Sequence, residues 1–374
     1  MKKILILSVS AGQGHVRAAE ALRTGTERWF GGEAEARHID LMDLTRPWFR
    51  TAYKGSYMKF VNRYPALWGF LYNRTDRDKA EGVLNGLRRK LESHVSEPLL
   101  RVMKEYQPDI VLSTHFLPGQ VLGRWRRKGR IENIDHWIVV TDFLAHRFWL
   151  EPGQTGYFTA TEENAFIMRR RGLEEERIEL SGIPIMPEFS DSISREEGAA
   201  AFGLDPARTT VLLMAGGEGL GLIKDVADEL SSVEADYQLA VLAGRNQKLL
   251  AELKEMAAER PSRLAPLGFT TDMPKLLAAS DLVVTKPGGL TTCECLAMGK
   301  PMIVVSPIPG QEEANCDYLL EHCAAWKASS LSALVYKTLK LINDGQTLEG
   351  LGRNAAAIGK PFAARSILET ILAG

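Results

Sequence analysis

The chain of 374 residues alternates short apolar segments with longer helical stretches along almost its whole length. Short apolar strands separated by helices are typical of parallel, doubly wound sheets with helices on both faces. We therefore predict an α/β fold in which the second half repeats the plan of the first. The expected strands are Ile4–Ser10, Ala36–Leu41, Asp109–Thr114, Trp137–Thr141, Gly156–Ala160, Ile178–Ser181, Thr210–Ala215, Gln238–Ala243, Arg263–Gly268, Leu282–Thr285, Met302–Ser306 and Ala324–Ala328.

A domain boundary is expected near Gly182-Ile-Pro-Ile-Met-Pro-Glu-Phe189, because one glycine and two prolines fit poorly inside a helix or strand. We predict a first domain over residues 1–185 and a second over residues 186–354. The remaining segment, 355–374, is predicted to contain an amphipathic helix that could pack back on the first domain.

The most specific pattern follows two strands of the second half. The strand that ends at Thr285 leads into Gly288 and Gly289, and a helix is expected to begin near Leu290, followed by Thr291. Glycines allow a ligand to approach the backbone closely, and the unpaired N–H groups of a helix N-terminus bind anions.

Four polar side chains accompany this turn. Glu294, one turn into the helix, can accept hydrogen bonds from a ribose diol, while Gln311, Glu312 and Asn315 follow the next strand. Together these groups can hold a phosphate, a ribose and a polyhydroxylated group, so the pattern predicts a sugar-nucleotide site. The alternative is an ordinary strand–turn–helix with a solvated Glu294, which leaves the other residues unexplained.

Two further loops of the second half carry weaker signals. Gly216 and Gly217, in Ala215-Gly-Gly-Glu-Gly219, either bind the same ligand or form a plain turn. Phe269 follows another strand and could pack beside a nucleobase, although an aromatic residue at such a position is more often part of the core.

The first half offers a candidate base. Gly12 and Gly14 permit a tight turn after the first strand, and His15 lies at the start of the next helix. The positive end of the helix dipole disfavours imidazolium, so we expect a neutral His15 that can take a proton from an acceptor hydroxyl. The competing interpretation is a histidine that only braces the loop.

Three more polar residues follow first-half strands: His115, Asp142 and His146. We expect them either to border an acceptor pocket or to act as hydrogen-bonding loop residues. Their spacing does not match a metal site, and the chain has no Asp-x-Asp motif, so no metal or other cofactor is required.

The formal net charge of −1 conceals a basic first half and an acidic second half. Residues 44–75 contain no Asp or Glu, and they combine cations with aromatic side chains as a helix on anionic lipid would. Residues 124–130 form a second basic cluster around a tryptophan. Nucleic acid is a weaker candidate partner because no nucleic-acid motif is present, and solvated cations around core aromatics are the plain alternative. The candidate membrane contacts are Trp48, Arg50, Lys54, Lys59, Arg63 and Trp68.

These motifs resemble the diglyceride glycosyltransferases, namely monogalactosyldiacylglycerol synthases and processive diacylglycerol glucosyltransferases, and more distantly the lipid II-forming N-acetylglucosaminyltransferase. The similarity extends over nearly the whole chain, with Ala11 where many relatives have a glycine. The strings that carry it are Ser10-Ala-Gly-Gln-Gly-His15, Val139-Val-Thr-Asp-Phe-Leu-Ala-His146, Ser181-Gly-Ile-Pro184, Val284-Thr-Lys-Pro-Gly-Gly-Leu-Thr291 and Pro307-Ile-Pro-Gly-Gln-Glu-Glu-Ala-Asn315.

The resemblance implies a GT-B fold, with two Rossmann-like domains facing across a cleft and the donor held mainly by the second. It implies a metal-independent, inverting transfer of glucose or galactose from its UDP-sugar to diacylglycerol. By similarity, His15 would be the base and Glu294 would hold the ribose. Residues 288–290 would hold the diphosphate, Gln311 and Glu312 the sugar, and Phe269 the uracil region.

We therefore expect a cytoplasmic protein that is peripheral on the inner face of the cell membrane, since the sequence has no bilayer-spanning run and no secretory signal. Two other functions also fit the motifs. A UDP-sugar epimerase of related fold would use the same donor pocket without an acceptor. A non-catalytic UDP-sugar sensor docked on membranes would tolerate the loss of His15.

Overall fold

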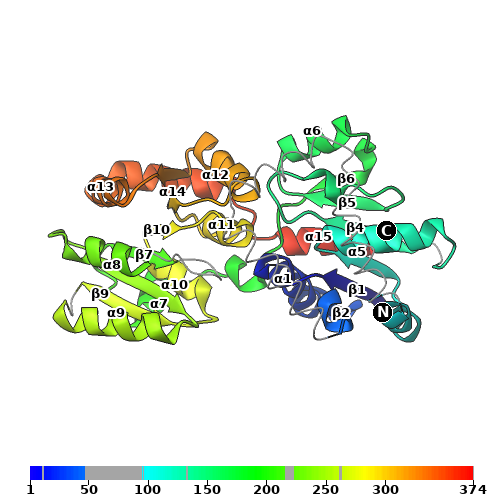
Figure 1. Ribbon diagram of the computed structural model, residues 1–374, viewed down its shortest axis with the longest axis horizontal. Coiled ribbons are helices and arrows are strands. Elements are labelled where there is room, and N and C mark those ends of the chain that lie inside the picture. Colours follow the sequence, from blue (N-terminus) through cyan, green and yellow to red (C-terminus); the bar gives the residue numbers. More distant parts are fainter. Residues whose placement is uncertain are drawn as a thin grey trace. The chain divides into compact units, whose positions relative to one another are not determined.

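The computed structural model describes residues 1–10, 12–46, 95, 97–131, 134–214, 223–260 and 263–373. The chain divides into two compact units (Figure 1). The first unit comprises Met1–Pro187, Ile308–Ala314 and Phe362–Gly374, and the second comprises Glu188–Pro307 and Asn315–Pro361.

The first unit contains a six-stranded parallel sheet of order β2-β1-β3-β4-β5-β6. Its strands are β1 Lys2–Ser8, β2 Ala34–Asp40, β3 Ile110–Ser113, β4 Asp135–Val139, β5 Gly156–Thr159 and β6 Ile178–Leu180. Its helices are α1 Gln13–Phe30, α5 Phe116–Arg127, α6 Glu162–Arg170 and α15 Ala363–Ala373, together with the short 3-10 turns η1 Leu41–Leu44, η2 Arg147–Trp149 and η3 Glu175–Arg177.

Alternate residues of the first sheet enter two separate cores, because successive side chains of a strand point to opposite faces. On β1, Ile4 and Ile6 pack with α1 and α15, whereas Leu5 and Leu7 pack with α5 and the helical residues 97–106. The C-terminal helix α15 lies beside α1, where Ile367 is fully buried (Figure 1).

The second unit repeats the design with a parallel sheet of order β12-β11-β10-β7-β8-β9. Its strands are β7 Thr210–Met214, β8 Gln238–Gly244, β9 Leu264–Gly268, β10 Leu282–Thr285, β11 Met302–Val305 and β12 Ala325–Ala328. Its helices are α7 Arg195–Phe202, α8 Ile223–Ser232, α9 Gln247–Glu259, α10 Met273–Ala279, α11 Gly289–Ala297, α12 Gln311–Glu321, α13 Leu331–Ile342 and α14 Gly345–Ile358. The first residues of α12 belong to the first unit, and a short 3-10 turn, η4, covers Pro187–Ser190.

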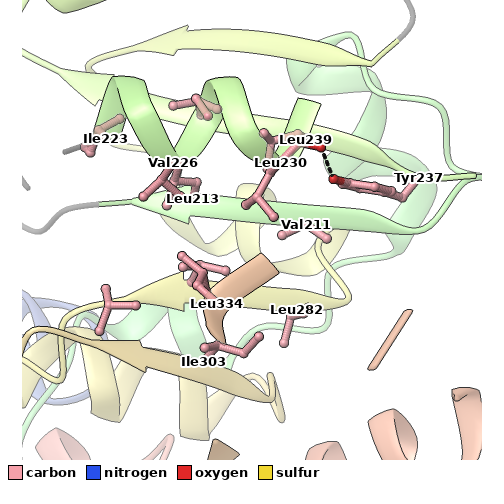
Figure 2. Packing of buried hydrophobic residues seen from close by; sticks show 14 of the residues in the cluster. Val211, Leu213, Ile223, Val226, Leu230, Tyr237, Leu239, Leu282, Ile303 and Leu334 are labelled. Atoms are coloured by element: carbon pink, nitrogen blue, oxygen red, sulfur yellow. Dashed lines mark hydrogen bonds between the residues drawn. The ribbon is translucent and has the colours of Figure 1, made fainter. Parts of the chain in front are cut away.

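One face of the second sheet is shown in Figure 2, where Val211 and Leu213 of β7 meet Val226 and Leu230 of α8. The Tyr237 hydroxyl donates a hydrogen bond to the main-chain carbonyl of Leu230, so this buried polar group has a partner. The apolar faces of β7 and α8 are thus buried against each other.

The fold class predicted from the sequence is confirmed. Each of the twelve expected strands is present, with ends that differ from the prediction by at most two residues, and both sheets are parallel and flanked by helices. In the part of the chain that the structure describes, no helix is long and apolar enough to cross a membrane.

The strand order reverses once in each sheet, between β1 and β3 in the first unit and between β7 and β10 in the second. Ligands of doubly wound sheets bind beyond the carboxyl ends of the strands at such a reversal. The loop with His15 follows β1, and the turn with Gly288 follows β10, so both predicted motifs occupy this position in their own unit.

A prediction about stability follows from the contact between α7 and α10. A Cβ atom at Gly198 would lie 2.3 Å from the carbonyl oxygen of Lys275 and 3.0 Å from the main-chain nitrogen of Ala279. Helix propensity alone favours alanine over glycine by about 1 kcal/mol. We nevertheless expect Gly198→Ala to lower the free energy of unfolding by about 1–3 kcal/mol, measured by urea denaturation, because two backbones must separate.

Gly350 supplies a matched control. It lies inside α14, and a Cβ there would meet nothing closer than the guanidinium of Arg353 at 3.9 Å. Gly350→Ala should therefore stabilise the protein by about 0.5–1 kcal/mol. Equal stabilisation by both substitutions would contradict the close packing at Gly198.

Candidate functional site

His15 is held by the ends of two neighbouring strands. Its Nδ1 lies 3.0 Å from the carbonyl oxygen of Thr114, just after β3, and 2.7 Å from Oγ1 of Thr141, just after β4. The Thr114 hydroxyl in turn donates to the main-chain carbonyl of His15 at 2.8 Å. Both the side chain and the backbone of His15 are therefore fixed.

Burial lowers the pKa of His15 to about 4, and the hydrogen bond to the Thr114 carbonyl opposes this shift only in part. The imidazole is therefore neutral at pH 7, as the sequence predicted. The main cause is desolvation, whereas the sequence argument invoked the helix dipole. A neutral histidine whose Nδ1 faces a carbonyl carries its proton there, which leaves Nε2 as a proton acceptor.

His115 and His146 serve as helix N-caps. The Nδ1 atom of His115 accepts from the N–H of Leu117 at the start of α5, and Nδ1 of His146 accepts from the N–H of Phe148 at the start of η2. The ring of His115 also meets the ring of His15 edge to face, with centroids 4.5 Å apart. Burial, followed by the neighbouring His15, holds the pKa of His115 well below its usual value.

Asp142 is a buried carboxyl beside this histidine pair. It is 5% exposed, and its Oδ2 accepts from Nε1 of Trp149 at 2.9 Å. Burial raises the pKa of Asp142 to about 7, against the hydrogen bond from Trp149. The side chain of Gln311, from the 308–314 segment of the same unit, donates to Oδ1 of Asp142.

In the second unit, the turn after β10 presents an uncapped helix N-terminus. Gly288 is the N-cap of α11 and has no side chain that could accept from the first N–H groups. The first main-chain bond of the helix is Thr292 N to Gly288 O at 2.8 Å. The N–H groups of Gly289, Leu290 and Thr291 therefore lack helical partners and can meet an anion. A Cβ at Gly288 would meet no atom within 4 Å, so the space beside it is open.

Asn315 and Glu312 shape the neighbouring backbone. The buried amide of Asn315 donates to the Pro287 carbonyl at 2.8 Å and thereby ties α12 to the turn before Gly288. A carboxylate oxygen of Glu312 accepts from the N–H of Ile308 at 2.8 Å and closes the loop after β11. Glu294 is partly exposed on α11.

Phe269 is exposed rather than part of the core. Its ring follows β9 and is stacked by the guanidinium of Arg245, whose Cζ lies 4.5 Å from the ring centroid after the adjacent strand β8. Stacked flat groups at the carboxyl ends of two neighbouring strands can offer a face to a planar ring.

Some predicted residues lie outside the described ranges. Gly216 and Gly217 are among them, as are all six candidate membrane contacts, Trp48, Arg50, Lys54, Lys59, Arg63 and Trp68. Among described residues, the second basic cluster is engaged locally. Trp125 is fully buried, Arg126 donates to the carbonyls of Gly153 and Ile134, and Arg127 pairs with Glu151 at 2.5 Å.

Sequence reasoning missed the two threonines that hold His15 and the partners of Asp142 and Phe269. Thr141 lies in the string Val139–His146, which does not show that it holds His15, and Thr114, Trp149 and Arg245 belong to none of the motifs described above. Within the described ranges, no three His, Cys, Asp or Glu side chains converge as a metal site would require.

Two family models match this chain. Residues 15–185 match the monogalactosyldiacylglycerol (MGDG) synthase model, and residues 210–367 match the glycosyltransferase family 28 C-terminal domain. The matches divide the chain much as the two sheets do.

Relatives align over the full chain. The processive diacylglycerol beta-glucosyltransferase of Bacillus subtilis (strain 168) is 27% identical over 99% of this chain and 95% of that protein. The chloroplastic monogalactosyldiacylglycerol synthase 1 of Arabidopsis thaliana is 30% identical over 98% of this chain and 70% of that protein. The crystal structure of MurG from Acinetobacter baumannii covers 100% of both chains with a TM-score of 0.65 at 16% identity, a likeness that shows the GT-B fold alone.

The raised pKa of Asp142 predicts how the stability of the protein changes with pH. Its carboxyl is protonated in the folded state below about pH 7 but ionises near pH 3.8 when unfolded, so stability is lost as pH rises through this window. Asp142→Asn removes that loss and keeps an oxygen for Trp149. We expect it to raise the free energy of unfolding by about 2 kcal/mol more at pH 8 than at pH 5.

Asp236→Asn is the control for this measurement, because Asp236 is 95% exposed in its side chain. Its effect on the free energy of unfolding should be small at both pH values. An effect of Asp142→Asn that does not change with pH would show that the carboxyl is ionised in the folded protein.

Proposed function

Because this chain belongs to the family of monogalactosyldiacylglycerol synthases and processive diacylglycerol glucosyltransferases, we propose that it transfers a hexose from a UDP-sugar to a diacylglycerol-type lipid. The family membership is carried by the match to the plant synthase, which is 30% identical over 98% of this chain and 70% of that protein. The relatives named above are glucosyl- and galactolipid-forming enzymes, which supports UDP-glucose or UDP-galactose as the donor.

The observation that carries the catalytic proposal is the neutral His15 with its Nδ1 proton held by a carbonyl. Nε2 takes the proton of the acceptor hydroxyl while that oxygen attacks the anomeric carbon from the side opposite UDP. The bond from the sugar to UDP breaks as the new glycosidic bond forms, so the configuration inverts. No metal ion takes part in the proposed reaction.

The donor side of the proposal rests on the Gly288 turn, the loops after β8 and β9, and the 308–314 segment. The uncapped N–H groups of Gly289 and Leu290 stabilise the charge that develops on the leaving diphosphate. Glu294 accepts from the ribose, Gln311 and Glu312 contact the hexose, and the Arg245–Phe269 stack receives the uracil ring. Because its amide is buried, Asn315 influences the donor indirectly, through its hydrogen bond to the Pro287 carbonyl.

We place the protein on the cytoplasmic face of the membrane, since its proposed acceptor is a lipid. The acid-free stretch over residues 44–75 supports an anionic membrane surface as its partner. The basic cluster at residues 124–130 adds little to this surface, because Arg126 and Arg127 are engaged by carbonyls and by Glu151.

His15→Ala tests the catalytic proposal. We expect transfer of labelled hexose to diacylglycerol in vesicles to fall by about 10²–10⁴-fold, the usual contribution of a general base, while the affinity for UDP stays nearly the same. His322→Ala, at an exposed histidine just after α12, should leave transfer unchanged.

Glu294→Gln separates donor binding from proton transfer. This variant should weaken UDP binding in calorimetry, because a neutral amide accepts hydrogen bonds from the ribose less strongly than a carboxylate. If His15→Ala weakens UDP binding as much as Glu294→Gln does, His15 belongs to donor binding and the base role is lost.

A vesicle experiment tests the membrane partner. Arg50→Glu, Lys54→Glu and Lys59→Glu together should weaken co-sedimentation with anionic vesicles, with a larger loss at low salt, since each cation near such a surface contributes about 1 kcal/mol. The same reversal at the exposed Lys248, Lys254 and Lys327 changes the net charge equally and should have little effect. If both triple variants lose vesicle binding equally, binding depends on the net charge of the protein and the proposed membrane contacts are wrong.

A further inference from the structure

We propose that Thr141 is a positioning residue for the transfer reaction, and that with the Thr114 carbonyl it forms a two-oxygen bracket that keeps His15 in the Nδ1–H tautomer. The inference rests on the proposed role of His15 as the base. The bracket is built from the carboxyl ends of β3 and β4, whereas His15 begins α1 after β1.

The carbonyl of Thr114 determines which nitrogen carries the proton. A carbonyl oxygen only accepts hydrogen bonds, and it lies 3.0 Å from Nδ1. The opposite tautomer would place the Nδ1 lone pair against the carbonyl lone pairs. The contact with the Thr141 hydroxyl at 2.7 Å is ambiguous on its own, because a hydroxyl both donates and accepts.

The Thr141 hydroxyl becomes an acceptor once Nδ1 carries the proton. Its own hydrogen can then point to the Thr114 carbonyl, 3.5 Å away. Thr141 is 4% exposed, so bulk water does not readily replace this oxygen if it is removed. Two acceptors on different strands restrict rotation of the ring as well as the position of its proton.

The surroundings of the ring leave few other ways to fix it. Trp149 lies at a centroid distance of 6.1 Å and His115 at 4.5 Å, and these rings contact the face or edge of the imidazole. Ring contacts restrict orientation but do not distinguish the two tautomers. Among the described residues, only the two bracket oxygens lie within hydrogen-bond distance of a ring nitrogen of His15.

Orientation matters because proton transfer requires Nε2 within hydrogen-bond reach of the acceptor hydroxyl. While the ring is rotated away, or while its proton is on Nε2, His15 cannot accept the proton of the acceptor hydroxyl. Loss of Thr141 Oγ1 should therefore reduce turnover while leaving the affinity for the donor nucleotide unchanged, since the donor residues lie in other loops.

The experiment compares Thr141→Val with Thr141→Ser. Valine keeps the shape of threonine but has no acceptor, so we expect kcat to fall by about tenfold with an unchanged KM for the UDP-hexose. Serine keeps the oxygen and should restore kcat to within about threefold of the wild type. Loss of turnover in both variants would overturn the proposal, because the hydroxyl would then not be the decisive group.

A second readout does not depend on activity. Nitrogen NMR of labelled full-length protein distinguishes protonated from unprotonated ring nitrogens, and His15→Ala identifies the signals of His15. The wild type should show a protonated Nδ1, and Thr141→Val should show a measurable population with the proton on Nε2. A wild-type signal with the proton on Nε2 would overturn the bracket.

The two readouts separate this inference from the proposed function. If the bracket is seen by NMR but the wild type transfers no hexose to diacylglycerol, the proposed function fails while the bracket stands. If Thr141→Val transfers at the wild-type rate and His15→Ala does not, His15 remains the base and Thr141 loses its role.

Discussion

Where the strand order of a parallel sheet reverses, the connections from two neighbouring strands leave toward opposite faces, and an opening remains above their carboxyl ends. Both units of this protein are organised around such a reversal, at β1/β3 in the first and β7/β10 in the second. His15 and the Gly288 turn each follow a strand that forms the reversal. Their positions are therefore consequences of sheet topology, and the core packing that fixes the strands also fixes these groups.

Burial has opposite consequences for the two kinds of titratable group near the first reversal. Desolvation disfavours charge, so it lowers the pKa of His15 and raises that of Asp142. At pH 7 His15 is therefore neutral and can accept a proton, while about half of Asp142 is protonated. The shift at His15 removes stability as the pH falls from about 6.5 to about 4, whereas the shift at Asp142 removes it as the pH rises from 3.8 to about 7. Such opposed shifts are usual where a site is arranged for chemistry.

The sequence predicted the sheets well because apolar strand periodicity is a local signal. It also located His15 and the Gly288 turn, since glycines before a helix are a local signal too. It did not reveal Thr114 or Thr141 as partners of His15, because those contacts depend on the register between strands more than twenty residues apart. Trp149 lies only seven residues from Asp142, but no local pattern marks their hydrogen bond. For the basic cluster at residues 124–130, charge composition alone does not show that Arg126 donates to main-chain carbonyls.

The surroundings of the glycines in the two turns are stronger evidence for a ligand than the spacing of those glycines in the sequence. Gly12 and Gly288 both have negative φ, so neither needs glycine for its backbone conformation, and a Cβ at either would meet no atom within 4 Å. Internal packing therefore gives no reason for the missing side chain at these two positions. The remaining reason for glycine is access for a ligand, because a backbone without a Cβ lets a substrate approach the helix N-terminus directly. The same fold can hold other sugar-nucleotide chemistry, so the reaction follows from the family and from His15 rather than from the sheets.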